Sequence, residues 1–197
     1  PYYARAIKER NAHRARQDRR FELIRADVGT TDLAGVLRGV DVVFHQGAQP
    51  GVRGSWADGF GVYLDNNVRA TQRLLEAAVT AKVTRFVYAS SSSVYGNAER
   101  YPTLETDRPE PFSPYGVTKL AAEHLCVLYS ANFGVPTVSL RYFTVYGPRQ
   151  RPDMATHRLV ECALDQRPFP MFGDGAQERA FTYVGDVVDA TFRAGVT

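Results

Sequence analysis

The chain has 197 residues, of which 44% are hydrophobic and 23% are charged, and its formal net charge is +3. This composition predicts a globular chain of one domain and part of a second, and it excludes disorder, collagen-like repeats and coiled coils. No apolar run reaches the length of a membrane span and no signal peptide is visible, so a membrane is not an expected partner. The two cysteines and four histidines lack metal-ligand spacing, which predicts no metal site and a reducing, cytoplasmic location.

Positive charge is concentrated at the start of the chain, where basic residues run from Arg5 to Arg20. We interpret this run as a solvated helix face, because a nucleic-acid patch would need a docking motif beside it. Nucleic acid is therefore not an expected partner. Arginine outnumbers lysine 21 to 3, so a lysine inside a motif is less easily accidental.

Short apolar runs alternate with helical periods along the chain. The expected elements are a strand over 21–28, a short helix over 32–39, a strand over 41–45, a helix over 64–80, a strand over 84–89, a helix over 115–133, a strand over 137–142, a helix over 156–166, a strand over 181–184 and a helix from 186. Strands that are continuous apolar runs and alternate with helices predict an α/β chain with a parallel sheet covered on both faces.

Polar clusters fall at the carboxyl ends of the expected strands, over 45–53, 90–96 and 141–151. Ligands of parallel sheets bind at this edge, so the sequence predicts a binding site there. A dinucleotide-binding unit opens with a strand, a glycine-rich turn and a helix. That opening is missing here, and we expect both ends of the sequence to be cut.

Tyr115 and Lys119 lie four residues apart at the start of an expected helix, so their side chains share one face. An ammonium beside a phenol stabilises the phenolate and makes the tyrosine a usable base. A serine-rich strand end precedes this pair, and a serine hydroxyl there could share a substrate oxygen with Tyr115. Without that context, the same pair is only a helix-surface contact.

Four motifs in order resemble the extended short-chain dehydrogenases that act on nucleotide sugars: Tyr-Ala-Ser-Ser-Ser-Ser-Val-Tyr-Gly (88–96), Ser-Pro-Tyr-Gly-Val-Thr-Lys (113–119), Leu-Arg-Tyr-Phe-Thr-Val-Tyr-Gly-Pro (140–148) and Arg-Ala-Phe-Thr-Tyr-Val-Gly-Asp (179–186). The resemblance implies a Rossmann-like doubly wound parallel sheet that lacks its first strand and glycine-rich turn. It also implies an NAD-binding core over 1–147, the start of a smaller substrate domain over 148–197, and a homodimer.

The resemblance assigns roles to single residues. It implies that Tyr115 is the base, that Lys119 holds the nicotinamide ribose and that Ser91 is the hydroxyl partner. The other implied cofactor contacts are Asp27 and Val28 at the adenine, Gln46, Gly47 and Ala48 in the turn along the cofactor, and Tyr142 at the nicotinamide. For Tyr142 the alternative is an ordinary core position, and Asn66 and Asn67 either bond the cofactor or cap the helix that follows.

The serine run also bears on the reaction. Family dehydratases carry Thr-Asp-Glu before Val-Tyr-Gly, where this chain has Ser91, Ser92 and Ser93. Without carboxylates to carry protons, elimination of water is not expected. The decarboxylases carry a glutamate at the position of Ser93, so that reaction is not expected either. What remains is oxidation at C4 and reduction from the other face, which defines an epimerase of a UDP-sugar, with Ser91 and Ser92 at the substrate.

Thr144 and Arg151 bear on the sugar. The segment from Thr144 to Met154 is similar to UDP-glucuronate 4-epimerases, in which a threonine and an arginine hold the substrate carboxylate, and a guanidinium suits a carboxylate. Arg179 resembles the arginine that grips the substrate diphosphate. The alternatives are a polar loop at Thr144 and Arg151, a neutral UDP-sugar 4-epimerase or dTDP-sugar enzyme, and a non-catalytic NAD-binding fragment.

Overall fold

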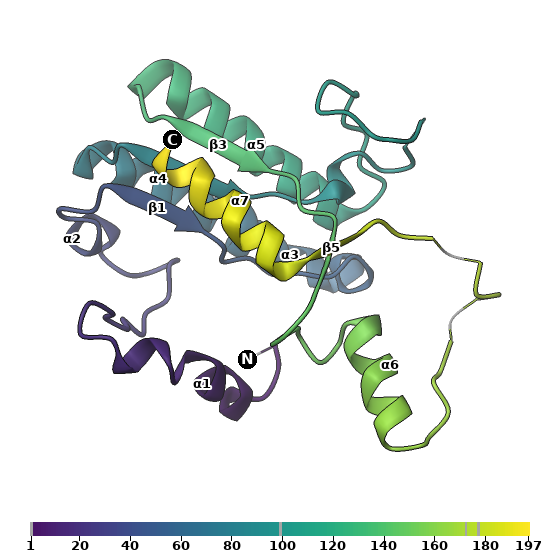
Figure 1. Cartoon of the computed structure of the whole chain (residues 1–197). Coiled ribbons are helices and arrows are strands. Elements are labelled where there is room, and N and C mark those ends of the chain that lie inside the picture. Colours follow the sequence, from purple (N-terminus) through teal and green to yellow (C-terminus); the bar gives the residue numbers. More distant parts are fainter. Residues whose placement is uncertain (1, 99, 172, 177) are drawn as a thin grey trace. The chain divides into compact units, whose positions relative to one another are not determined.

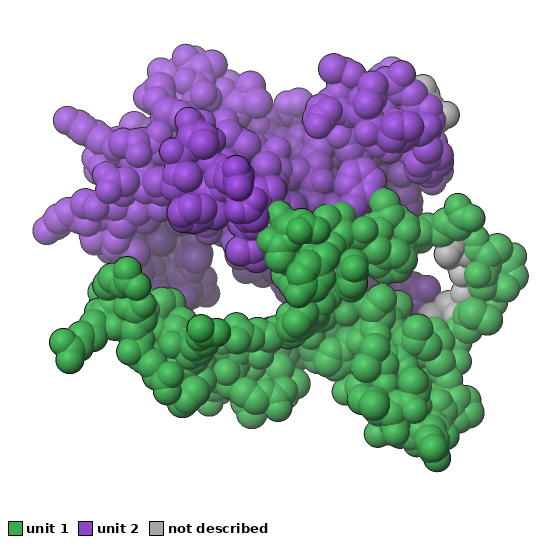
Figure 2. All heavy atoms as spheres, viewed as in Figure 1, with its two compact units in different colours: residues 1–25, 144–187 green, residues 26–143, 188–197 purple. Residues whose placement is uncertain are grey.

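The computed structural model describes residues 2–98, 100–171, 173–176 and 178–197. The chain divides into two compact units, a larger one of residues 26–143 and 188–197 and a smaller one of residues 1–25 and 144–187 (Figure 2). The division into residues 1–147 and 148–197 that the sequence suggests stays a prediction.

The centre of the larger unit is a parallel sheet of β1 (Val42–His45), β2 (Arg85–Ala89) and β3 (Thr137–Leu140), in the order β1-β2-β3 (Figure 1). Val43 lies opposite Phe86, and Val87 lies opposite Val138. The side chains of Phe86 and Val87 are fully buried, as a central strand covered on both faces requires. The predicted α/β class with a parallel sheet is confirmed.

The helices of the larger unit are α2 (Leu33–Val36), α3 (Phe60–Tyr63), a π-helical segment (Leu64–Arg69), α4 (Ala70–Ala81), α5 (Pro114–Phe133) and the carboxyl part of α7 (Val184–Val196). Short 3-10 turns lie over Arg53–Ser55, Ala57–Gly59 and Ser92–Val94. The helix expected over 64–80 therefore begins earlier and contains a π-helical segment.

Both faces of the sheet are covered by helices. Val43 belongs to a buried cluster with Leu74 and Leu75 of α4 and Cys126 of α5. Successive residues of a strand point to opposite faces, so Phe44 points away from this cluster. On that other side a Cβ added to Gly195 of α7 would meet the Phe44 ring, and in Figure 1 this part of α7 crosses the front of the sheet.

The strand expected over 21–28 is wrong. Residues 21–27 form no regular element and are exposed, with the side chain of Ile24 52% accessible. An apolar run becomes a strand only when a neighbouring strand pairs with its backbone groups. Within the described residues, the sheet pairs only β1, β2 and β3, so this run has no strand beside it.

The smaller unit contains α1 (Arg5–Ala12), a 3-10 turn (Ala15–Gln17), α6 (Ala155–Leu164) and the start of α7. Its two strands, β4 (Thr144–Tyr146) and β5 (Phe181–Tyr183), pair in parallel. The sequence predicts β5 but not β4, which lies within the polar cluster over 141–151. In the parts of the chain that the structure describes, no helix has both the length and the apolar character needed to cross a membrane.

Local sequence signals define both ends of α5. Ser113 caps the first turn, because its side chain accepts a hydrogen bond from the backbone N–H of Gly116, and Pro114 occupies the first helical position. At the other end Gly134 takes the left-handed conformation, with φ of 68°, that terminates many helices. The cap matters for the site because Tyr115 lies in the first turn.

We expect Ser113→Ala to lower the free energy of unfolding by about 1 kcal/mol, since alanine leaves the capped N–H without its acceptor. Ser113→Gly is the matched control and should cost only a few tenths of a kcal/mol, about the usual difference between these caps. Urea denaturation of the three proteins measures both values. Equal stability of Ser113→Ala and the unsubstituted protein would show that the cap contributes nothing.

Candidate active site

The segments that follow β1, β2 and β3 meet at the carboxyl edge of the sheet. The backbone N–H of Ser92 donates to the carbonyl of Tyr142 at 2.8 Å. The side-chain amide of Gln46 donates to the Tyr142 hydroxyl at 3.3 Å, and that hydroxyl also bonds Thr191 at 2.7 Å. The structure therefore brings three of the predicted site positions together: Gln46, Ser92 and Tyr142.

Ser91 caps the 3-10 turn that follows β2. Its hydroxyl oxygen accepts a hydrogen bond from the N–H of Ser93 at 3.2 Å, which leaves the hydroxyl proton available for another acceptor. The first turn of α5 lies directly against this serine turn. A Cβ added to Gly116 would be 2.5 Å from the Ser93 carbonyl oxygen, so only glycine permits the approach.

Lys119 lies one turn beyond Tyr115 on α5 and is 3% exposed. Its ammonium donates to the carbonyl of Ala89 at 2.7 Å and lies 4.9 Å from the centre of the Tyr88 ring. Burial lowers the pKa of Lys119 to about 8, and the carboxylate of Glu123 opposes this shift. The ammonium is therefore charged at neutral pH but releases a proton more readily than a solvated lysine.

Tyr115 is half-buried and contacts the ring of Tyr63 in α3. Its ring meets that of Tyr63 in a T-shaped contact, with centroids 6.1 Å apart. The Tyr63 hydroxyl donates to the carbonyl of Gly51 at 2.7 Å, in the loop after β1. The hydroxyl of Thr118 donates to the backbone carbonyl of Tyr115 at 2.8 Å. Nothing in the sequence marks Tyr63 as part of this arrangement.

Asn67 joins the loop after β1 to α5. Its side-chain oxygen accepts from the N–H of Gln49 at 2.7 Å, and its amide donates to the Gln49 carbonyl and to Thr118, both at 3.1 Å. The residue is buried within the π-helical segment rather than at a helix start. Of the two roles that the sequence leaves open, the helix cap is wrong, and the side chain instead fixes the turn that contains Gln46, Gly47 and Ala48.

His45 extends the same polar chain into the core. The Thr71 hydroxyl donates to the carbonyl of Asn67 at 2.6 Å, so it accepts from Nε2–H of His45 at 2.8 Å. Burial, helped by the positive charge of Lys119, lowers the pKa of His45 to about 4. The imidazole is therefore neutral at neutral pH and serves as a fixed hydrogen-bond donor.

Asp27 and Val28, the predicted adenine contacts, lie in a turn. The Asp27 carboxylate accepts from the N–H of Gly29 at 2.7 Å and stays exposed. Val28 is half-buried against the core, and its carbonyl accepts from Nε of Arg73 at 3.1 Å. The turn is thus anchored to α4.

Thr144, Arg151 and Arg179, the predicted substrate contacts besides the serines, belong to the smaller unit. Thr144 begins β4, and Arg179 is exposed. Arg151 forms a two-point ion pair with Asp153, at 3.0 and 3.1 Å, and its guanidinium lies 5.2 Å from the centre of the Tyr2 ring. The described residues contain no cluster of three or more His, Cys, Asp or Glu suited to a metal ion.

Comparison with known proteins places this site in a family. The model of the NAD dependent epimerase/dehydratase family matches residues 2–196. The chain therefore belongs to the NAD-dependent epimerase/dehydratase family, as the motifs indicate. The sheet confirms the predicted Rossmann-like class, since the fold matches solved epimerases of this family.

Three relatives illustrate the degree of similarity in sequence and structure. The chain is 50% identical over 183 residues to the uncharacterised UDP-glucose epimerase YtcB of Bacillus subtilis, covering 93% of this chain and 58% of that protein. It is 36% identical over 197 residues to a probable UDP-glucuronate 4-epimerase of Rhizobium meliloti, covering 98% and 58%. The crystal structure of UDP-glucuronic acid 4-epimerase from Bacillus cereus, in complex with UDP-glucuronic acid and NAD, superimposes with a TM-score of 0.91 at 49% identity, covering 96% and 60%.

The chain thus spans about three fifths of the length of these relatives. These relatives differ in the substrate for which they are named, since one is named for UDP-glucose and two are named for UDP-glucuronate. NAD is present in the crystal structure from Bacillus cereus.

We expect the free energy of unfolding to fall as pH is lowered from about 6.5 to about 4, because the unfolded chain protonates His45 at its ordinary pKa and the folded chain does not. At pH 5 this effect should reach about 1–2 kcal/mol relative to pH 7. His45→Gln should remove that part of the pH dependence in urea denaturation at the two pH values. If the variant keeps the full pH dependence, His45 is not its source.

Proposed function

We propose that the full-length protein is an NAD-dependent 4-epimerase of a UDP-sugar and that Ser91, Tyr115 and Lys119 carry out its proton transfer. The main support is the close approach of the first turn of α5 to the serine turn after β2, which Gly116 permits. The buried Lys119 ammonium on the same helix face adds a positive charge that favours the phenolate. Family membership supports the same chemistry.

The residues at this edge of the sheet fit a dinucleotide. The turn after β1 carries the small residues Gly47 and Ala48. The side chain of Asn67 holds this turn in place, because it bonds both the backbone N–H and the backbone carbonyl of Gln49. We expect the cofactor to be held by Asp27, Val28, Gln46, Gly47, Ala48, Tyr115, Lys119 and Tyr142. NAD, when bound, accepts a hydride from the sugar carbon and returns it.

The residues of the chain move one proton. In the proposed reaction, the phenolate oxygen of Tyr115 takes the proton of the C4 hydroxyl, while the hydroxyl of Ser91 donates a hydrogen bond to the same C4 oxygen. Lys119 keeps its charge close to the phenol and contributes a hydrogen-bond donor toward the ribose. Tyr115 returns the proton to the C4 oxygen after the sugar has turned its other face, and Ser92 lies next to Ser91 at the substrate.

For the substrate we propose UDP-glucuronate, with Thr144 and Arg151 at its carboxylate and Arg179 at its diphosphate. The similarity to two proteins named for UDP-glucuronate supports this choice. A neutral UDP-sugar such as UDP-glucose is the second candidate. It is favoured by the ion pair of Arg151 with Asp153, which already neutralises the guanidinium that a substrate carboxylate would need.

We also propose that the protein is a homodimer with α5 at its interface. Apolar side chains of α5 remain exposed, with Val127 64% accessible and Leu128 54% accessible, whereas Leu125 packs against the core. A second copy would cover these side chains and remove apolar surface from water. Sedimentation equilibrium of the full-length protein measures this state.

We expect Tyr115→Phe to lower turnover by about two to four orders of magnitude, because the hydroxyl transfers a proton in the transition state. Binding of NAD, measured by calorimetry, should stay close to that of the unsubstituted protein. Tyr101→Phe is the control, since Tyr101 is 84% exposed and outside the proposed site. Turnover that survives in Tyr115→Phe would remove Tyr115 from the role of base.

We expect Arg151→Ala to weaken binding of UDP-glucuronate by tens- to several-hundred-fold, which corresponds to the loss of about 2–4 kcal/mol from a partly buried charge pair. Binding of UDP-glucose should hardly change, because that sugar has no carboxylate. Arg167→Ala is the matched control, since Arg167 pairs with Asp165 at the same two-residue spacing. If the full-length protein converts UDP-glucose but not UDP-glucuronate, the substrate is a neutral UDP-sugar and the proposal of UDP-glucuronate is wrong.

A further inference from the structure

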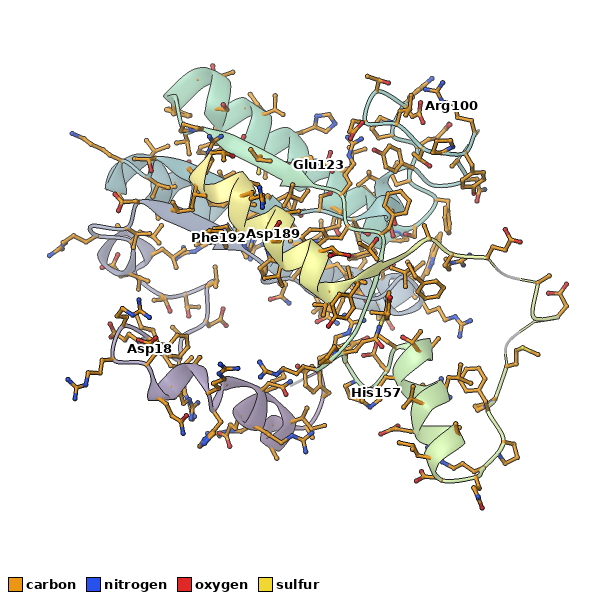
Figure 3. All side chains as sticks on the ribbon, in the orientation of Figure 1. Asp18, Arg100, Glu123, His157, Asp189 and Phe192 are labelled. Atoms are coloured by element: carbon orange, nitrogen blue, oxygen red, sulfur yellow. The ribbon has the colours of Figure 1, made fainter. Side chains whose placement is uncertain are left out.

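Glu123 forms a buried network outside the residues that the proposed reaction uses. It lies on α5 one turn beyond Lys119, is 7% exposed and is labelled in Figure 3. Its carboxylate accepts from Nη2 of Arg141 at 2.8 Å and from Nε of Arg141 at 3.1 and 3.2 Å. The hydroxyl of Ser90 donates to the same carboxylate. One side chain thus bonds the end of β2 and the end of β3.

Arg141 is itself held at several points. Its Nη1 donates to the Tyr95 hydroxyl at 2.9 Å and to the carbonyl of Glu105 at 3.2 Å, and the guanidinium lies 4.8 Å from the centre of the Tyr95 ring. The hydrogen bonds to Glu123 raise the pKa of Arg141. Because the pair is largely buried and joined by several hydrogen bonds, its geometry is more rigid than that of a surface ion pair.

The backbone at Ser90 is fixed from two directions. Its N–H donates to the carbonyl of Leu140 at 2.9 Å, which ties it to β3, and its hydroxyl ties it to Glu123 of α5. Ser91 is the next residue. Any displacement of Ser90 therefore moves the hydroxyl that is proposed to share the substrate oxygen with Tyr115.

The charge of Glu123 also reaches Lys119. The groups that act on the Lys119 ammonium are His45 of β1, Tyr88 of β2, and Glu123 and Cys126 of α5. Burial keeps three of these groups neutral, because it lowers the pKa of His45 to about 4, raises that of Cys126 to about 12 and raises that of Tyr88. The Glu123 carboxylate pairs directly with Arg141, and among the groups that act on the Lys119 ammonium it is the charged one that raises the pKa of Lys119.

We propose that Glu123 is a positioning residue of this site, which holds Ser90 and so Ser91 at the end of β2 and whose carboxylate acts on the Lys119 ammonium one turn earlier on α5. Its role rests on the proposed function of Ser91, Tyr115 and Lys119. It adds a residue that touches neither sugar nor cofactor and acts through two residues that do.

The first test measures the ionisation of Lys119 directly. The full-length protein is labelled with ¹³C-lysine, and the Cε resonance of Lys119, assigned by its loss in Lys119→Met, is followed as pH is raised. The unsubstituted protein should titrate near pH 8. In Glu123→Gln the pKa of Lys119 should fall by at least about half a unit, roughly a threefold change in its ionisation constant.

Two further variants make this test specific. Glu76→Gln is the control, because Glu76 also accepts a hydrogen bond from a residue of α5, the hydroxyl of Tyr129, about 15 Å along the helix from Lys119. It should leave the Lys119 titration unchanged. If Glu123→Gln does not fold, Glu123→Gln/Arg141→Gln replaces both charges by amides and should lower the pKa of Lys119 by a smaller amount, because loss of the Arg141 cation acts in the opposite direction. An unchanged titration in the folded Glu123 variant overturns the proposal.

The second test separates charge from position. Glu123→Asp keeps the carboxylate but shortens its reach to Ser90, so Lys119 should titrate as in the unsubstituted protein while kcat falls at least tenfold and KM changes little. Full turnover of Glu123→Asp would overturn the positioning of Ser91. A shifted Lys119 titration together with a fully active Tyr115→Phe would instead mean that the proposed function fails and the effect of Glu123 on Lys119 stands.

Discussion

A buried ammonium group needs an acceptor, and in this chain Lys119 finds it in the carbonyl of Ala89. Burying the charge without that bond and without nearby negative charge would cost several kcal/mol. Because Ala89 ends β2 and Lys119 lies in α5, the bond fixes the helix against the carboxyl edge of the sheet. The serine turn, Tyr115 and the Glu123 network all lie along the junction of α5 and β2 that this contact holds, together with the bond from Ser90 to Glu123.

The rest of the edge is held by side chains that bond backbone groups of distant loops. The side chain of Asn67 bonds both backbone polar groups of Gln49, the N–H and the carbonyl, and the Tyr63 hydroxyl donates to the backbone carbonyl of Gly51. Loops without regular structure are normally mobile, and each of these contacts removes that freedom at a position where a ligand would bind. The turn after β1 is thus preorganised by residues that come from a single stretch of helix.

Much of this arrangement could be predicted from the sequence where the signal is local. Ser113, Pro114 and Gly134 mark both ends of α5, and the spacing of Tyr115 and Lys119 puts them on one helix face. The run over 21–28 failed as a strand because strand formation depends on a partner, which no local pattern reveals. Arg141 and Glu123 meet only because β3 and α5 pack together, so their pairing is invisible in the sequence. Of these two residues only Glu123 could have been placed near the site from the sequence, because it continues the four-residue spacing of Tyr115 and Lys119 along the helix.

The π-helical segment Leu64–Arg69 makes the site sensitive to insertion and deletion rather than to substitution. A π-helical turn accommodates one residue more than the α-helical turns around it. Deleting one residue there would restore a continuous α-helix and remove the bulge that contains Asn67, while the helix on either side would keep its facing. Asn67 would then leave Gln49 and Thr118 while every other contact of α4 with the core stayed possible. The length of this turn, more than the identity of most residues in it, is what directs Asn67 toward the loop.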